Sequence, residues 1–258
     1  MWLDAPSVAG NNWRMTVQTL FGDPIGRLLT DWVPPARPLR VDVSGDWAAL
    51  EAMTLYEHAE PLYEAFADDP QGRIWTYMFG GPFADAEEFQ TWIEDGCLGD
   101  DPLFYALRDL RTGLLGGMTS FMRITPEAGT IEIGNIAFAP RLQRSAAATE
   151  AIFLMLDRAF ALGYRRVEWK CNALNMPSRR AARRLGFTYE GAFRQHMVVK
   201  GRNRDTAWYA IIDADWPRLR PAYEAWLSPA NFDAQGRQRR SLSDLTAPLL
   251  APAALSEA

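Results

Sequence analysis

The segment PRLQRSAAATEA, residues 140–151, decides the fold of this chain. It follows a strand-like run, TIEIGNIAF at residues 130–138, and leads into a stretch whose apolar residues recur at helical spacing. A loop that turns from a strand into a helix leaves several backbone N–H groups unpaired at the positive end of the helix dipole. The pattern therefore predicts a phosphate-binding site at residues 143–148.

The strand before this loop changes phase. Its apolar residues fall first at odd positions, Ile131 and Ile133, and then at even positions, Ile136 and Phe138. One face of the strand can stay buried only if one residue is absorbed between the two pairs. Gly134–Asn135 is the natural place for such a β-bulge, because glycine tolerates the required dihedral angles. The bulge is expected to bend the strand and to interrupt its hydrogen-bond ladder.

Further elements follow the loop in a regular order. The helix is expected to stop at Gly163, and a strand at 167–171 then completes a strand, helix and strand unit. Asn175 is expected to cap a second helix at 177–185. The last predicted elements are two antiparallel strands, 187–193 and 206–212, and a closing helix at 215–227.

The residues before the loop predict the rest of the sheet. Segments 103–108 and 114–124 predict a hairpin, and Asp85 is expected to cap a helix over 84–95. Leu39 to Val43 alternates like a strand. The next element is expected to be a helix capped by Ser44 or Asp46 and outlined by Trp47, Leu50, Met53 and Leu55.

The chain is expected to have three parts. Residues 1–38 hold several prolines and are predicted to form an extended arm that packs on the domain. The arm holds scattered tryptophans, which are Trp2, Trp13 and Trp32. Residues 39–227 are predicted to form the domain. Residues 228–258 are rich in Pro, Ala, Ser, Arg and Asp and are expected to form a partly mobile C-terminal extension.

Composition limits the possible functions. A chain of 258 residues, 48% of them hydrophobic, can bury a full core, and its formal net charge of −5 gives no general attraction to nucleic acid. Two cysteines and two histidines are too few for a disulfide framework or a histidine-rich metal site. No basic leader and no long apolar run is present. We therefore expect a cytoplasmic protein without a metal, a membrane span or a nucleic-acid partner.

The order of sheet, bulged strand, small-residue loop, helix, strand and Asn-capped helix resembles that of the GNAT acyltransferase superfamily, from Leu39 to Leu227. The chain is most similar to its RimJ/RimL-type branch. The resemblance implies an α+β fold with a central, mixed, mostly antiparallel sheet, a splayed pair of parallel strands, and helices on both faces. Two motifs carry it: the coenzyme-loop motif falls on Gln143, Ala146 and Ala148, and the second on Asn175, Ser178 and Leu185-Gly186-Phe187.

The resemblance also implies an enzyme that transfers an acetyl group from acetyl-CoA, its co-substrate, to a primary amine of a protein N-terminus or a small molecule. The pyrophosphate would accept hydrogen bonds from the loop, and the pantetheine arm would lie between the splayed strands. Asn175 is expected to hydrogen-bond this arm, and Ser178 to lie near its sulfur. The other coenzyme-binding residues are expected to be Ile136, Ala137, Phe138, Gln143, Arg144, Ser145, Ala146, Ala147 and Ala148.

Two loop positions depart from the family pattern. The family carries glycine at the position of Ala146, and this branch commonly carries glycine at the position of Arg144 as well. Alanine suits the start of a helix if its φ is negative. Arg144 either gains a phosphate contact or is an exposed arginine without such a role.

The resemblance also suggests catalytic residues. Glu132 is the candidate general base, because related enzymes often carry a carboxylate there that acts through water. The alternative is an ordinary polar residue on an alternating strand. The tyrosine that reprotonates the thiolate in many members falls at Ala182, so this acid is absent. Ser178 is expected to replace it as the general acid, and a helix-surface serine is the alternative.

Other reactive side chains are expected to be structural. Tyr189 is expected to pack on a strand, Cys171 to be a small buried residue, and His58 and His196 to be structural or exposed. A run of arginines either meets the 3′-phosphate of CoA or forms a solvated helix face: Arg179, Arg180, Arg183 and Arg184. A set of aromatic residues is expected to pack in the core, with acceptor binding as the alternative: Trp75, Tyr77, Phe79 and Phe83.

The pattern leaves two other functions open. The same fold could use a longer acyl donor such as succinyl-CoA, which a basic residue near the thioester would favour. A non-catalytic sensor or interaction module that binds CoA would account for the missing tyrosine. The aromatic N-terminal arm also makes a homodimer contact reasonable, and the identity of the acceptor amine is not encoded in a recognisable pattern.

Overall fold

The computed structural model describes residues 16–250, so the predicted roles of Trp2, Trp13 and residues 251–258 lie outside the described residues. The chain divides into two compact units, Met1–Pro34 and Pro35–Ala258. The first unit contains a small hairpin of β1 (Thr16–Gln18) and β2 (Pro24–Gly26). The boundaries at residues 38 and 227 stay predictions, and everything below concerns the second unit.

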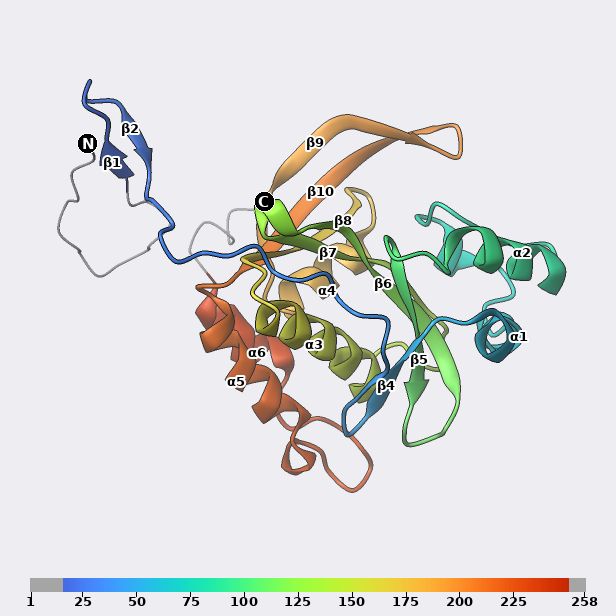
Figure 1. The fold of residues 1–258 in the computed structure, drawn as a ribbon. Helices are drawn as coiled ribbons and strands as arrows, with labels where there is room; N and C mark the ends of the chain where they lie inside the picture. Colours follow the sequence, from blue (N-terminus) through green and yellow to red (C-terminus); the bar gives the residue numbers. More distant parts are fainter. Residues whose placement is uncertain (1–15, 251–258) are drawn as a thin grey trace. The chain divides into compact units, whose positions relative to one another are not determined.

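An eight-stranded sheet forms the centre of this unit, in the order β3-β4-β5-β6-β7-β8-β10-β9 (Figure 1). All neighbouring strands run antiparallel except β7 and β8, which are parallel. The strands are β3 (Val43–Ser44), β4 (Ala48–Ala52), β5 (Leu103–Asp109), β6 (Leu115–Thr125), β7 (Thr130–Phe138), β8 (Arg166–Asn172), β9 (Thr188–Val199) and β10 (Arg202–Ile212). The mixed, mostly antiparallel sheet predicted from the sequence is confirmed.

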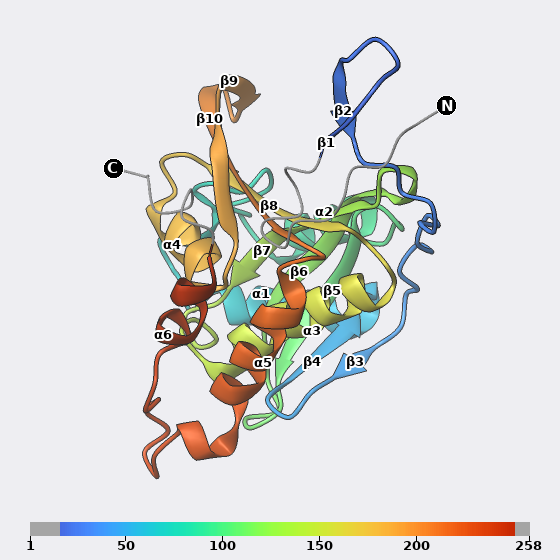
Figure 2. The ribbon, with the colours of Figure 1, turned by 90° about the vertical axis from the view of Figure 1, so that its left-hand side faces the viewer.

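Helices cover both faces of the sheet, α1 and α2 on one side and α3 and α5 on the other (Figures 1 and 2). The α-helices are α1 (Leu55–Phe66), α2 (Ala86–Gly96), α3 (Ala146–Ala161), α4 (Met176–Arg184), α5 (Trp216–Leu227) and α6 (Leu242–Thr246). Part of the C-terminal extension packs on the domain, because Leu242 is buried and the Thr246 hydroxyl donates to the carbonyl of Arg184.

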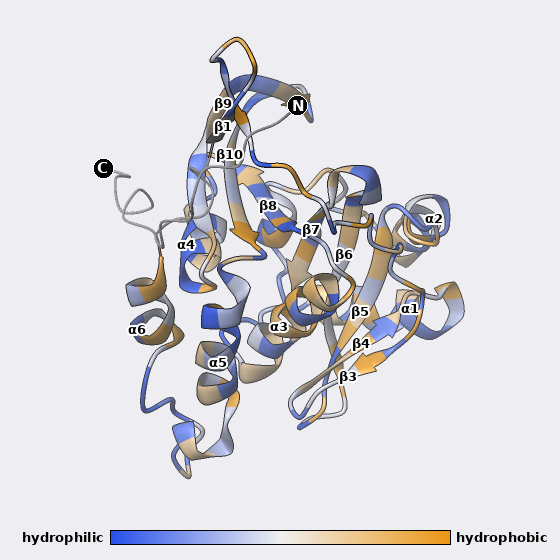
Figure 3. Ribbon diagram, turned by 60° about the vertical axis from the view of Figure 1, so that its left-hand side comes forward, coloured by the Kyte–Doolittle hydropathy of each residue, from blue (hydrophilic) through white to orange (hydrophobic). Residues whose placement is uncertain are grey.

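Hydrophobic residues concentrate on the central strands and on the sheet-facing sides of the helices (Figure 3). They form two clusters, one on each side of the sheet. In the cluster under α1 and α2, Trp75 and Phe83 pack edge to face, and both contact Phe89 and Trp92. Trp75 and Phe83 therefore pack in the core as expected.

The helix predicted between Ser44 and Leu55 is wrong. Residues 48–52 form β4, which pairs with β5, and the helix α1 begins only at Leu55. The carboxylate of Glu150, from α3, accepts hydrogen bonds from the backbone N–H groups of residues 46, 47 and 48 and holds this segment extended. The strand expected over 39–43 is also shorter, because β3 covers only Val43 and Ser44.

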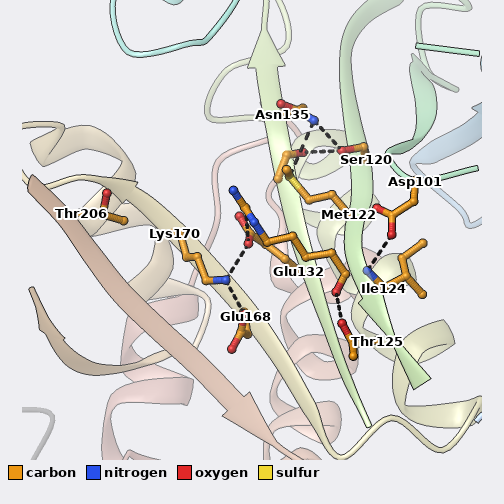
Figure 4. Close-up of polar contacts among 12 residues, drawn as sticks. Asp101, Ser120, Met122, Ile124, Thr125, Glu132, Asn135, Glu168, Lys170 and Thr206 are labelled. Carbon is orange, nitrogen blue, oxygen red and sulfur yellow. Dashed lines mark hydrogen bonds and ion pairs between the residues drawn. The ribbon is translucent and has the colours of Figure 1, made fainter. Parts of the chain in front are cut away.

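The predicted bulge in β7 is present. Ser120 of β6 lies opposite Gly134, and Met118 lies opposite Ala137, so two residues of β7 face one residue of β6. Asn135 is the residue with positive φ, at 51°, and its side-chain amide donates to the Ser120 hydroxyl at 3.0 Å (Figure 4). Gly134 is required for a different reason: a Cβ added at this position would lie 2.5 Å from the sulfur of Met122, so a larger residue would clash.

The parallel strands β7 and β8 separate soon after they begin. They pair at only three positions, and the last pair is Glu132 with Glu168. Beyond this pair, the edge of β7 that faces β8 has no strand partner among the described residues. The splayed pair expected from the sequence is therefore present, and the gap opens at Glu132.

Candidate active site

A pocket lies where β7 and β8 separate. Its walls come from the end of β6, the bulged part of β7, the end of β8, the start of α4, the strands β9 and β10, and the segment 74–79 that follows α1. Four of the candidate catalytic and coenzyme-binding residues line it together: Glu132, Ile136, Asn175 and Ser178. The structure thus brings both candidate catalytic residues into one pocket.

Glu132 lies in an ion-pair network at the floor of this pocket. Its side chain is only 4% exposed, and its Oε2 accepts a hydrogen bond from Arg123 at 2.7 Å. Lys170 Nζ lies 3.0 Å from the same oxygen and 2.5 Å from Oε2 of Glu168, so it sits between the two carboxylates (Figure 4). Within residues 16–250, Oε1 of Glu132 has no hydrogen-bond partner.

This network follows from the strand register. Glu132 and Glu168 are direct partners in the parallel ladder, so two like charges are brought side by side, which is unfavourable without a cation. Lys170 supplies that cation and also lies over the ring of Trp208, 3.9 Å from its centre. Burial alone would raise the pKa of Glu168, but hydrogen bonds from Lys170 and Arg166 outweigh it and lower that pKa.

Asn175 and Ser178 are positioned by the start of α4. Oδ1 of Asn175 caps the helix by accepting from the backbone N–H of Ser178 at 3.1 Å. The Ser178 hydroxyl oxygen accepts from the indole Nε1 of Trp169 at 3.0 Å. Because the oxygen is engaged as an acceptor, the hydroxyl hydrogen remains to donate to a ligand in the pocket.

The structure also places the other candidates. Ala182 is fully buried in the core away from the pocket, and Tyr189 packs against Tyr209 outside it. Cys171 is buried and lines the pocket from β8. His58 is buried far along the chain from these residues, in a network in which its Nε2 lies 3.1 Å from Glu51.

For two pocket residues, Tyr77 and His196, the sequence favoured a structural role, with acceptor binding as the alternative for Tyr77. The hydroxyl of Tyr77 donates to the carbonyl of Leu174, just before the cap of α4, so this phenol lines the pocket. His196 also lines it, and its Nδ1 lies 3.0 Å from the Thr206 hydroxyl. No local motif marks either residue, because each reaches the pocket only through long-range folding.

The loop before α3 uses some of its own donors. The N–H groups of Gln143 and Ser145 bond to carbonyls within the loop, and that of Ala148 donates to the Ser145 hydroxyl, which caps α3. The N–H groups of Arg144, Ala146 and Ala147 have no acceptor within the described part of the chain. These three are the loop donors that a phosphate can reach.

The predicted coenzyme edge of β7 is also partly occupied. The side-chain amide of Gln143 donates to the carbonyl of Phe138 at 2.9 Å. Ile136 lines the pocket, whereas Ala137 is buried. The role of these residues in binding a coenzyme stays a prediction.

The arginines of α4 do not form a uniformly solvated face. Arg179 donates to the Tyr209 hydroxyl and to the carbonyl of Ala173. Arg184 donates to the Thr149 hydroxyl, and burial lowers its pKa. Both therefore hold α4 against its neighbours.

Of the two positions that depart from the family motif, Arg144 is the one with a strained backbone. Its φ is 60°, in the left-handed region, whereas Ala146 begins α3.

We expect Arg144→Gly to be about 1 kcal/mol more stable than Arg144→Ala, because a positive φ is strained for alanine and not for glycine. Urea unfolding measures the difference. Both variants lack the guanidinium, so a loss of acetyl-CoA affinity in both, relative to wild type, would report the contact of that group with a phosphate. Equal stability of the two variants would contradict the assigned strain.

Comparison with known proteins identifies the family. Residues 49–188 match the model of the acetyltransferase (GNAT) domain. The chain belongs to the GNAT acetyltransferase family. Among curated proteins, no sequence matches this chain. Within residues 16–250, no helix is long and apolar enough to cross a membrane, and no cluster of three His, Cys, Asp or Glu side chains is arranged to hold a metal ion.

Solved structures of GNAT proteins are similar to it. A GCN5-related N-acetyltransferase from Brucella melitensis is 45% identical, with a TM-score of 0.83, over 85% of this chain and 100% of that one. A probable GNAT acetyltransferase from Chromobacterium violaceum is 36% identical, with a TM-score of 0.71, over 76% and 98%. A microcin self-immunity acetyltransferase in complex with acetyl-CoA and AMP shares the fold at 23% identity, with a TM-score of 0.58, over 65% and 93%.

Proposed function

We propose that this GNAT protein transfers an acetyl group from acetyl-CoA to a primary amine by direct attack, without a covalent enzyme intermediate. The observation that carries the proposal is the gap between β7 and β8, which has Glu132 at its base and Ser178 at its side. Acyl-CoA-dependent transfer to amines is the general reaction of the family that residues 49–188 match.

Acetyl-CoA suits this gap in two ways. Its pyrophosphate can accept hydrogen bonds from the unpaired N–H groups of Arg144, Ala146 and Ala147 at the start of α3. Its pantetheine arm carries amides, which can pair with the edge of β7 that β8 leaves open. The distantly related microcin self-immunity enzyme, which was solved with acetyl-CoA, supports the choice of donor.

The chemistry requires a neutral amine. The amine nitrogen attacks the thioester carbonyl, the carbon–sulfur bond breaks, and the amine loses one proton while the thiolate gains one. Oε1 of Glu132 is the free carboxylate atom that can take the first proton, directly or through water. The hydroxyl of Ser178, whose hydrogen is not used within the described residues, can supply the proton to the thiolate.

The acceptor and the branch are part of the proposal. We place the protein in the RimJ/RimL-type branch, whose members act on protein N-termini and small amines. A ribosomal-protein-serine acetyltransferase described only as putative, from Vibrio cholerae, has the same fold at 19% identity, which supports the fold alone. A cytoplasmic location and a homodimer remain predictions of the sequence.

The test is acceptor-dependent release of free CoA thiol from acetyl-CoA with a panel of primary amines. The control variant is Ala146→Asp, because aspartate is favourable at the first turn of a helix but repels a pyrophosphate there. We expect turnover by the wild type and at least tenfold weaker acetyl-CoA binding by the variant. Tight acetyl-CoA binding without turnover of any amine would instead favour the non-catalytic CoA-binding sensor.

A further inference from the structure

Arg204 is a buried cation that has no carboxylate partner among residues 16–250. It projects from β10 into the pocket and is only 7% exposed. Across residues 16–250, no carboxylate lies within 4.0 Å of its guanidinium, and its buried Nε has no hydrogen-bond acceptor. Its close contact is with the ring of Phe79, 4.9 Å from Cζ to the ring centre. Burial is the main cause that lowers its pKa.

Arg166, on the neighbouring strand β8, shows how a partly buried arginine of this sheet is paired with carboxylates. Arg166 of β8 is partly buried as well, yet it pairs with Glu168 at 2.7 Å and with Glu190 through two nitrogens. Hydrogen bonds to Glu190 and Glu168 raise its pKa, whereas burial lowers that of Arg204. A buried charge costs several kcal/mol unless it is paired, so a partner for Arg204 from outside the chain would account for its retention.

The charge of the pocket agrees with an anionic ligand. Its charged lining consists of three cations, Arg123, Lys170 and Arg204, and one carboxylate, Glu132. Arg123 and Lys170 are both paired with Glu132, so within residues 16–250 Arg204 is the one of the three cations that has no carboxylate partner. A guanidinium presents a planar fork of donors that matches a carboxylate.

The position of Arg204 favours the acceptor over the acyl donor. Its ring contact, Phe79, belongs to the segment between α1 and α2, on the face of the sheet opposite α3. The predicted coenzyme loop begins α3 on the other face. A group bound at Arg204 therefore approaches the gap from the side away from that loop.

We propose that Arg204 binds a carboxylate of the acceptor, so that the preferred substrates are amines that carry a nearby carboxylate, such as amino acids or short acidic peptides. The inference rests on the proposed transfer reaction and names its substrate class. Polycationic amines are then poor acceptors, because Arg204 repels them. A dicarboxylic acyl donor such as succinyl-CoA would bring the same chemical group, and the experiment separates the two sources.

The experiment compares each amino acid with its carboxamide as acceptor, and acetyl-CoA with succinyl-CoA as donor, in wild type and Arg204→Met. In the wild type we expect kcat/KM to favour the free acid by roughly 10- to 100-fold, the value of a charge-assisted hydrogen bond. The ratio should fall to near one in Arg204→Met. Arg202→Met, an exposed change on the same strand, should keep the wild-type ratio.

Two further readouts keep the outcomes separate. Because Arg204→Met removes an unpaired buried charge, its midpoint of urea unfolding should equal or exceed that of the wild type, and a lower midpoint would contradict the assigned role. Without any donor, the free amino acid should raise the melting temperature of wild type and not of Arg204→Met, even if no amine is turned over. A wild type that treats acid and amide alike overturns the proposal. Arg204→Met could instead lose a preference for succinyl-CoA over acetyl-CoA while its ratio of acid to amide stays at the wild-type value. That result would assign the carboxylate to the donor and overturn the acceptor assignment.

Discussion

Replacement of Glu132 by glutamine is expected to lower kcat/KM for the amine acceptor by roughly 100- to 1,000-fold, the usual contribution of a general base. The amide keeps the shape of the side chain but cannot take a proton through Oε1. The variant should recover activity as the pH rises, because more of the amine is then already neutral in solution. The pH profile of kcat/KM measures this recovery.

Glu168→Gln is the matched control for this prediction. Both carboxylates lie within ion-pair distance of Lys170, but only Glu132 lines the pocket. If Glu132 takes the proton, Glu168→Gln should change kcat/KM by less than roughly tenfold and leave the pH profile unchanged. Equal losses in the two variants would mean that Glu132 acts only by holding Lys170.

Glu150→Ala is expected to reduce the free energy of unfolding by about 3–5 kcal/mol. Its buried carboxylate accepts hydrogen bonds from the backbone N–H groups of Asp46, Trp47 and Ala48, at 3.1, 2.6 and 2.7 Å. Alanine leaves these donors without their acceptor and also leaves a cavity. The midpoint of urea unfolding measures the loss.

The control for this effect is Asp157→Ala on the same helix. Asp157 is partly exposed and pairs with Arg220 at the surface, so its removal should cost no more than about 1 kcal/mol. Glu150→Gln tests the carboxylate itself, because it keeps one acceptor oxygen and most of the volume. It should fall between wild type and Glu150→Ala. A cost of Glu150→Ala as small as that of Asp157→Ala would show that water replaces the carboxylate.

Glu150 also explains where the prediction of the fold from sequence failed. The bulge of β7 was predictable because a change of phase is visible within nine residues, and the cap of α4 because Asn175 directly precedes the helix. The segment around Trp47 was not, because its conformation depends on Glu150, about a hundred residues away. Apolar spacing alone cannot distinguish a helix from a strand whose start is held by another helix.

The candidate site shows the same division. Glu132, Asn175 and Ser178 could be proposed because they hold fixed places around the motifs, and the structure brings them to one pocket. Arg204 could not, because an arginine on an alternating strand is typical of a solvated surface. It becomes conspicuous only when burial and the lack of a partner carboxylate are known.

The separation of β7 from β8 has a mechanical consequence. Five strands, β3 to β7, and three strands, β8 to β10, are joined within the sheet by only three residue pairs. A ligand whose amides bond to both open edges would act as a temporary strand between the two halves. Occupancy by the donor would then stiffen the sheet, and amide hydrogen exchange along residues 133–138 would slow before any acceptor arrives.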